Sequence, residues 1–223
     1  MLLKIIRYSL SSAIGRDLGV KKSVELGGVR LFVTEMSKKA ILLMGDGAEE
    51  MEAVITADVL RRAGVAVTIA SITGRECVKC SKNTKICADA LLGDVVPANT
   101  YDVVILPGGL GGSEALSQSK EVGELLKTQE QAGRIIAAIC AAPTALKAHG
   151  IGLGKKITSY PGKKDQLVGD YNYLEETVVV DGKLITSRGP ATTFAFALTI
   201  VSELLGKEAA LPIAKAMLYN DFK

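Results

Sequence analysis

Residues 134–146 read RIIAAICAAPTAL, and this stretch carries most of the information about fold and chemistry. The apolar run 134–139 predicts a strand that is buried on both faces. Pro143 fits the first turn of a following helix, where its missing N–H has no partner to lose. Cys140 lies between the two, so the pattern predicts a nucleophile elbow on a strand-to-helix turn.

The same alternation of strand and helix continues on both sides of this stretch. Apolar runs predict strands, turn residues mark their ends, and a 3.6-residue spacing of apolar residues predicts helices. The predicted strands are 40–44, 65–70 and 102–106, and the predicted helices are 49–63, 122–132, 142–149, 191–205 and 207–218. In helix 49–63 we expect one apolar face, formed by Met51, Val54, Ile55, Val59 and Leu60.

This alternation predicts right-handed βαβ crossovers and a parallel sheet with helices on both faces. The fold class is therefore α/β, doubly wound, in a single domain. Residues 77–92 and 157–186 differ, because they contain short β segments with turn signals. Asp181-Gly182 predicts a hairpin between 178–180 and 184–186.

Composition narrows the class of protein. The 223 residues suit one domain, and 48% hydrophobic with 23% charged residues is typical of globular chains. The net charge of +3 is scattered, so the Lys pairs 38–39 and 163–164 indicate solvated surface and no specific nucleic-acid partner. No uncharged apolar run is long enough to span a membrane. Four cysteines in a chain of this length do not form a disulfide framework, which favours a reducing compartment.

Residues 1–36 differ from the domain expected at 37–223. The first eleven residues after Met1 are basic, contain serine and lack acidic side chains, as in a mitochondrial transit peptide. The alternative is a disordered or alternatively initiated extension, and Glu25 and Glu35 count against a long transit peptide. Residues 29–33 are expected to form either a stray strand or no ordered structure.

A nucleophilic cysteine needs an acid–base partner, and the chain contains a single histidine. His149 follows Cys140 by nine residues on one predicted helix, which places it about 13 Å away on roughly the opposite face. We therefore interpret His149 as structural. Glu49, Glu50 and Glu52 open the helix after the first strand and face the same crevice, but spacing alone does not choose between Glu49 and Glu52. A carboxyl group beside a thiolate in an apolar crevice should have a raised pKa and stay partly protonated.

Two further motifs each allow two interpretations. Pro107-Gly108-Gly109 ends another predicted strand, so its N–H groups either join an oxyanion site or form a plain tight turn. Cys77 and Cys80 form a C-x-x-C pair that opens no helix and has no second pair to complete a zinc site. Coincidence is the favoured interpretation, and a redox pair is the alternative.

Four ordered segments, 47–52, 106–109, 137–146 and 186–190, resemble the DJ-1 family of the ThiJ/PfpI superfamily. The resemblance begins near Lys38 and implies a flavodoxin-like homodimer. It also implies that Cys140 is a nucleophile that oxidises to sulfinate, with Glu52 as its hydrogen-bonding acid. The implied oxyanion donors are the N–H groups of Gly109 and Ala141. Further implied positions are the pocket rim, formed by Gly108, Arg62, Arg188, Pro190 and Tyr160, and two redox-modifiable thiols, Cys80 near the dimer interface and the peripheral Cys87.

The chain departs from the family pattern at two places. Ala142 replaces a glycine, and Tyr160 stands where a histidine is often found, which leaves Glu52 as the evident proton carrier. The expected function is a glyoxalase or deglycase-like enzyme that acts on small reactive aldehydes or glycated groups without metal, cofactor or glutathione. The alternative is a redox sensor and chaperone-like protein that responds through oxidation of Cys140. A cysteine peptidase is disfavoured, because no histidine reaches the thiol. The resemblance implies a cytoplasmic protein that is also found in mitochondria and the nucleus.

Overall fold

The computed structural model describes residues 21–26, 29–34, 37–96 and 98–222, and the chain divides into two units, Met1–Ser37 and Lys38–Lys223. In the first unit, β1 (Lys21–Leu26) and β2 (Val29–Thr34) pair as antiparallel strands. Residues 29–33 are thus in a strand, one of the two outcomes that the sequence left open. Residues 1–20 lie outside the described part, so a targeting segment or disordered extension stays a prediction.

The second unit is built on a seven-stranded sheet with the order β12-β13-β9-β8-β3-β4-β7. All neighbouring strands are parallel except β12 and β13, which form an antiparallel hairpin at one edge. The strands are β3 (Lys39–Met44), β4 (Ala66–Ser71), β7 (Ala90–Leu91), β8 (Val103–Leu106), β9 (Ile135–Ile139), β12 (Val178–Asp181) and β13 (Leu184–Ser187). The predicted α/β, mainly parallel architecture is confirmed.

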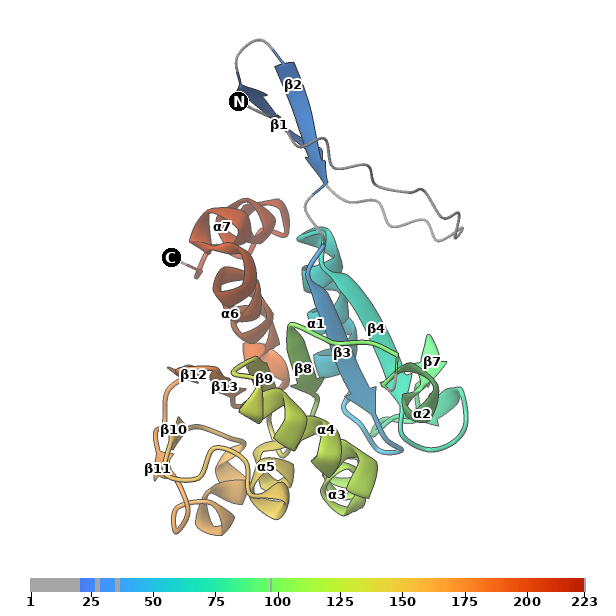
Figure 1. Ribbon diagram of the computed structural model, residues 1–223. Coiled ribbons are helices and arrows are strands. Elements are labelled where there is room, and N and C mark those ends of the chain that lie inside the picture. Colours follow the sequence, from blue (N-terminus) through green and yellow to red (C-terminus); the bar gives the residue numbers. More distant parts are fainter. Residues whose placement is uncertain (1–20, 27–28, 35–36, 97, 223) are drawn as a thin grey trace. The chain divides into compact units, whose positions relative to one another are not determined.

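Helices cover both faces of this sheet (Figure 1). Each face of the sheet carries an apolar cluster, because successive side chains of a strand point to opposite faces. On β3, Ala40, Leu42 and Met44 belong to the first cluster, and Ile41 and Leu43 belong to the second. The first cluster contains residues of α1 (Glu50–Arg62), α6 (Thr193–Leu205) and α7 (Lys207–Ala216). The second contains residues of α2 (Leu92–Val95), α3 (Leu110–Gln118), α4 (Lys120–Gln131) and α5 (Pro143–His149).

The helix predictions need two corrections. Met51 and Val54 are each 52% exposed, whereas Glu52, Ala53 and Thr56 face the interior. Small residues on the buried face let α1 pack closely against the sheet and α6, so the predicted apolar face was wrong at these two positions. Helix α3 was also missed, because its first half is rich in glycine and lacks an apolar period.

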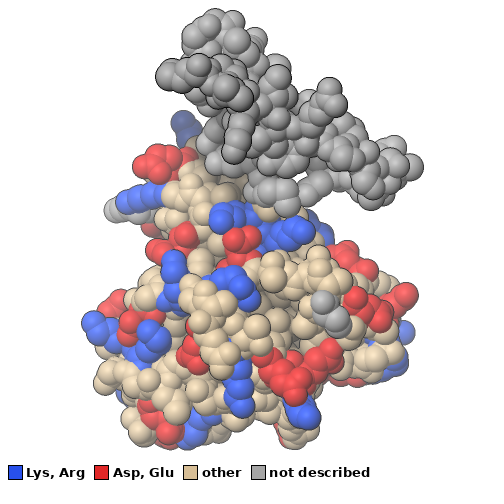
Figure 2. Space-filling model, viewed as in Figure 1, with Lys and Arg blue, Asp and Glu red and all other residues tan. Residues whose placement is uncertain are grey.

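Short elements complete the unit. They are the hairpin of β5 (Cys77–Lys79) and β6 (Lys85–Cys87), the parallel pair β10 (Lys156–Ile157) and β11 (Asn172–Tyr173), and the 3-10 helices Pro161–Gln166 and Pro190–Thr192. Over the described residues, no helix has the length and apolar character needed to cross a membrane. Figure 2 shows Lys and Arg interspersed with Asp and Glu over the face of the second unit in view.

Candidate active site

Cys140 occupies a strained turn at the carboxyl end of β9. Its φ of +64° is in the left-handed region, which a side chain bearing Cβ rarely adopts. The turn is held from two sides, because the Cys140 N–H donates to the Ser187 carbonyl at 3.0 Å and the Tyr160 N–H donates to the Cys140 carbonyl at 2.8 Å. Strand β9 therefore ends in a fixed turn that presents the thiol at the edge of the sheet where parallel strands end.

Glu52 lies beside this thiol in the first turn of α1, and its side chain is fully buried. The Gly108 N–H donates to Glu52 Oε2 at 2.7 Å, whereas Oε1 is buried and has no hydrogen-bond partner among the described residues. The Cys140 side chain lies close enough to the carboxyl group to influence its pKa. A Cβ added to Gly108 would lie 2.5 Å from Cys140 Cβ and 2.8 Å from Glu52 Oε2. Glycine is thus required at position 108 for the thiol and the carboxyl group to meet.

Two backbone N–H groups also lie near the Cys140 sulfur. They belong to Gly109 and Ala141, and both act to lower the pKa of the thiol. Gly109 has a φ of +82°, and a Cβ there would overlap the carbonyl oxygen of Gly47. The glycine pair 108–109 therefore lets two strand ends and the α1 loop converge on one sulfur atom.

The pKa values of the two side chains are both raised. Burial raises the pKa of Glu52 to about 7, against the opposing hydrogen bonds from Gly108 and Cys140. Burial and the Glu52 carboxylate raise the pKa of Cys140 to about 12, against the N–H groups of Gly109 and Ala141. Glu52 therefore loses its proton before Cys140 does, although the two groups titrate as an interacting pair.

The sequence predicted a different order, with a thiolate beside a partly protonated carboxyl group. The reason is that burial and a neighbouring carboxylate outweigh two backbone N–H groups, that of Gly109 before α3 and that of Ala141 before α5. The resting arrangement is a thiol next to a carboxyl group that can accept its proton.

The thiol opens onto a cavity of about 550 Å³. Its lining is Gly47, Glu49, Ser81, Lys82, Gly109, Leu110, Gly111, Cys140, Ala141, Tyr160 and Pro190. Ser81 and Lys82 were missed by the sequence analysis, since nothing in residues 77–92 signals that the tip of the β5–β6 hairpin lies over the thiol. A cavity of this size accommodates a small organic substrate.

The three acids of the first α1 turn take separate positions. Glu52 lies behind the thiol, whereas Glu49 lines the cavity and its Oε2 accepts a 2.7 Å hydrogen bond from Ser81 Oγ. Glu50 accepts the Lys82 N–H at 3.0 Å. Burial raises the pKa of Glu50, but hydrogen bonds from its own N–H, Ser81, Lys82 and Thr84 together lower it to about 2. Glu49 and Glu50 thus bind the β5–β6 hairpin to the start of α1. Of these three acids, only Glu52 lies beside Cys140.

The structure separates the residues expected at the pocket rim. Tyr160 and Pro190 line the cavity, and Gly108 lies buried between the thiol and Glu52. Arg62 does not line it, because it follows Glu52 by ten residues on α1, about 15 Å along the axis, and pairs with Asp58 at 2.6 Å. Arg188 does not line it either, because its guanidinium donates to the Glu175 carbonyl at 2.8 Å. Neither arginine therefore lines the cavity in this structure, and a role for them at its rim stays a prediction.

His149 lies away from the thiol, as helix geometry predicts. Its Nε2 is 2.9 Å from the Leu116 carbonyl oxygen, and its ring packs against Gly123. Among the residues placed in the structure, no group of three or more His, Cys, Asp or Glu side chains forms a metal site. The groups that surround the Cys140 sulfur are the Glu52 carboxyl group and the N–H groups of Gly109 and Ala141.

The two cysteines expected to be redox-modifiable differ in their bonding state. Cys87 is not a free thiol, because it forms a disulfide with Cys77. The C-x-x-C partner Cys80 is free and buried, and burial raises its pKa to about 11, which disfavours the reactive thiolate. Residues three apart on a strand point to opposite faces, so Cys77 meets its register partner on β6 instead of Cys80.

Comparison with known proteins gives one consistent result. A model of the DJ-1/PfpI family matches residues 38–203. Protein dj-1beta of Drosophila melanogaster is 55% identical over 188 residues, which cover 83% of this chain and 100% of that protein. Its crystal structure superimposes with a TM-score of 0.80, covering 82% of this chain and 98% of that one.

A second relative carries the name of an activity. The Caenorhabditis elegans protein called glutathione-independent glyoxalase DJR-1.2 is 44% identical over 178 residues. The match covers 79% of this chain and 94% of that protein. The similarity therefore extends over nearly the whole length of both relatives.

Proposed function

The chain belongs to the DJ-1/PfpI family, and we propose that it is a cysteine-dependent, glutathione-independent glyoxalase. Its substrates would be α-oxoaldehydes such as methylglyoxal, and its products hydroxy acids such as lactate. The name of the 44% identical glyoxalase supports this class of reaction. The observation that carries the proposal is the buried Glu52 in contact with the Cys140 thiol, with a pKa raised to about 7.

In the proposed reaction, the Glu52 carboxylate takes the thiol proton as the Cys140 sulfur bonds to the aldehyde carbon. This pairing suits a thiol whose own pKa is too high for spontaneous ionisation at neutral pH. The carbonyl oxygen becomes negatively charged, and the N–H groups of Gly109 and Ala141 beside the sulfur are available to stabilise it. Protonation of that oxygen by Glu52 gives a hemithioacetal and frees the carboxylate.

Glu52 then moves a proton between the two carbons. It removes the hydrogen of the former aldehyde carbon, which gives an enediolate, and it returns a proton to the neighbouring carbon. The product is a thioester of Cys140, and water breaks its C–S bond to release the hydroxy acid and the thiol. The sum is addition of one water to the oxoaldehyde, so no external oxidant or reductant enters. Deglycation of early glycation adducts applies the same thiol addition to another carbonyl.

Redox sensing is the second candidate. It is favoured by the half-buried position of Cys140, which leaves the sulfur open to the cavity while donors surround it. Two equivalents of peroxide would convert the thiol to sulfinic acid and release two waters. Protonated Glu52 and the N–H groups of Gly109 and Ala141 would hydrogen-bond the sulfinate oxygens.

Lactate formation from methylglyoxal without glutathione tests the enzymatic proposal. We expect Cys140→Ser to lose at least about 10³-fold in turnover, because the hydroxyl lacks an adequate base. The matched control is Cys80→Ala, which removes the other free thiol and should keep turnover. Equal turnover by wild type and Cys140→Ser would show that Cys140 is not the nucleophile. If wild type forms no lactate but peroxide yields sulfinate only at Cys140, redox sensing is the better account.

We also propose that the protein is a homodimer, as the family resemblance implies. Met51 and Val54 are exposed apolar side chains on one helix, and this is where a partner subunit would bury apolar area. The tip of the β5–β6 hairpin hydrogen-bonds to Glu49 and Glu50 at the start of α1. In a dimer formed through α1, the part of the cavity edge that this tip forms would therefore lie near the interface.

A further inference from the structure

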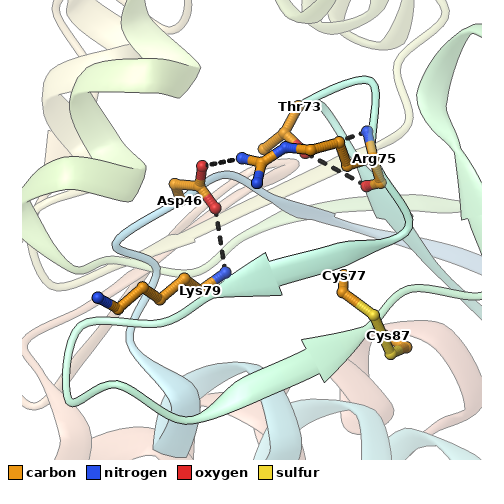
Figure 3. Close-up of a disulfide and its surroundings, with 6 residues drawn as sticks. All are labelled: Asp46, Thr73, Arg75, Cys77, Lys79 and Cys87. Atoms are coloured by element: carbon orange, nitrogen blue, oxygen red, sulfur yellow. Dashed lines mark hydrogen bonds and ion pairs between the residues drawn. A yellow bond between two sulfur atoms is a disulfide. The ribbon is translucent and has the colours of Figure 1, made fainter.

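The Cys77–Cys87 disulfide lies at the open end of the β5–β6 hairpin (Figure 3). Both cysteines are exposed, and they are register partners with Cα atoms 4.0 Å apart. Backbone hydrogen bonds run from Ala88 to Glu76 in the adjacent pair and from Cys80 to Thr84 three pairs along the hairpin. The cysteines therefore occupy a non-hydrogen-bonded pair, where side chains of opposite strands lie closest. A thiol reagent in solution can reach this disulfide.

The hairpin needs this cross-link more than most hairpins do. Each of its strands has three residues, and an isolated two-stranded hairpin is marginally stable in water. Lys79 and Lys85 form the next pair on the same face as the disulfide, both exposed. Like charges directly opposite one another destabilise a strand pair, and the disulfide opposes that repulsion. The same two positive charges favour approach of a thiolate and stabilise the thiolate that leaves.

The hairpin is also fastened to the loop that opens α1. The Gly47 N–H donates to the Lys79 carbonyl at 2.7 Å, and the Ser81 N–H donates to the Ala48 carbonyl at 2.8 Å. Asp46 accepts the Lys79 N–H at 3.0 Å and forms an ion pair with Arg75, so it holds the chain on both sides of Cys77 (Figure 3).

The far end of the hairpin is a wall of the Cys140 cavity. Ser81 and Lys82 both line the cavity, and they follow Cys77 by four and five residues. The state of the disulfide at one end of the hairpin thus bears on the position of the cavity wall at the other end.

We propose that Cys77–Cys87 is a second redox site, separate from Cys140, whose co-substrate is a small thiol or dithiol and whose state sets the order of this cavity wall. A thiolate attacks one sulfur, the S–S bond breaks, and a mixed disulfide forms. A second thiolate then resolves the mixed disulfide. In sum, two RSH become RSSR, and the protein gains two electrons and two protons as two thiols. A small disulfide such as oxidised glutathione reverses the reaction.

Reduction loosens the wall. Without the cross-link, the lysine pair and the short strands leave residues 79–84 free to separate from the α1 loop, which breaks the hydrogen bonds at Gly47 and Ser81. The cavity then loses a fixed wall at Ser81 and Lys82. Where the proposed glyoxalase activity holds, reduction should raise the KM for methylglyoxal about two- to fivefold and change kcat less.

Hydrogen exchange of backbone amides tests this inference without reference to turnover. The full chain is compared after equilibration with oxidised glutathione and after reduction by a dithiol. We expect the amides of Gly47, Ser81 and Lys82 to exchange about tenfold faster after reduction, and amides of β9 to keep their rates. The double variant Cys77→Ser/Cys87→Ser should show the fast rates under both conditions. The control Cys80→Ala should respond to reduction as wild type does.

Two results overturn the proposal. One is an intact mass that shows four alkylatable thiols after equilibration with oxidised glutathione, since the disulfide then does not form. The other is equal exchange at Gly47, Ser81 and Lys82 in the oxidised and reduced chains. Absence of lactate in the oxidised wild type would instead refute the glyoxalase proposal, and it would leave the exchange result standing.

Discussion

The N–H of Gly108 donates a 2.7 Å hydrogen bond to Glu52 Oε2, and the missing side chain of Gly108 is what lets Glu52 reach Cys140. The bond joins the end of β8 to the first turn of α1, which are separated by more than fifty residues. It orients a buried carboxyl group that the surrounding apolar packing would otherwise leave free to rotate. The site therefore depends on three residues together, Gly108, Glu52 and Cys140. A substitution at each of them has a different expected effect.

Gly108→Ala should damage the site through overpacking. The new Cβ would lie 2.5 Å from Cys140 Cβ and 2.8 Å from Glu52 Oε2, so backbone or side chains must shift. We expect a loss of about 1–3 kcal/mol in the free energy of unfolding and at least a tenfold loss of turnover. Gly169→Ala is the control, because its Cβ would meet nothing within 4 Å. Urea denaturation and a lactate assay check both, and a Gly108→Ala protein with wild-type stability and rate would contradict the close packing.

Glu52→Gln should change how stability depends on pH. Burial raises the pKa of Glu52 from 4.5 to about 7, so the folded state binds the proton more tightly than the unfolded state. This stabilising contribution is complete below about pH 4.5 and is lost as pH rises through about 7. It amounts to about 3 kcal/mol at most. The glutamine side chain of the Glu52→Gln variant does not ionise, so its free energy of unfolding lacks this pH-dependent loss. As pH rises, the variant should therefore become more stable relative to wild type. Denaturation curves from about pH 4.5 to about pH 8 should diverge, and parallel curves would rule out the raised pKa.

Backbone strain at Cys140 predicts an unusual ranking of variants. At a φ of +64°, glycine costs nothing and alanine carries the left-handed penalty. Cys140→Gly should therefore be about 1 kcal/mol more stable than Cys140→Ala, whereas glycine is normally the less stable of the two. Thermal unfolding of the two inactive variants measures the difference. Greater stability of Cys140→Ala would mean that the turn is not strained.

The proposed dimer predicts an effect of charge on α1. Wild type should sediment as a dimer at micromolar concentration, and Met51→Asp/Val54→Asp should shift it toward monomer, because charges at a buried interface are unfavourable. Val168→Asp is the control, since Val168 is also exposed, at 49%, but lies outside α1. The proposal fails if wild type is a monomer or if the control dissociates equally.

The sequence predicted the parts of the fold whose signals are local. The apolar run before Cys140 became β9 with nearly the expected bounds, and Pro143 does begin α5. The choice between Glu49 and Glu52 could not be made locally, since it depends on Gly108 arriving from β8. Ser81 and Lys82 were missed for the same reason, because only tertiary folding brings the β5–β6 tip over the thiol.

The cysteines illustrate the same limit. Sequence spacing drew attention to Cys77 and Cys80, but strand alternation separates them and register joins Cys77 to Cys87. Register depends on the turn between the strands, which includes Asn83 at a φ of +68°. The burial that raises the pKa of Cys140 was likewise invisible in the strand-to-helix pattern, which indicated only the N–H groups.

The central claim is that Glu52 acts as the proton carrier for Cys140, and the pH dependence of lactate formation by wild type and Glu52→Gln tests it most directly. In wild type, kcat/KM for methylglyoxal should rise with pH through about 7, because the Glu52 carboxylate must be free to take the thiol proton. Glu52→Gln should lose at least about 10²-fold in kcat and the rise near pH 7, with the fold intact. Turnover by Glu52→Gln at the wild-type rate, with the wild-type pH profile, would contradict the account and reduce Glu52 to a structural carboxyl group.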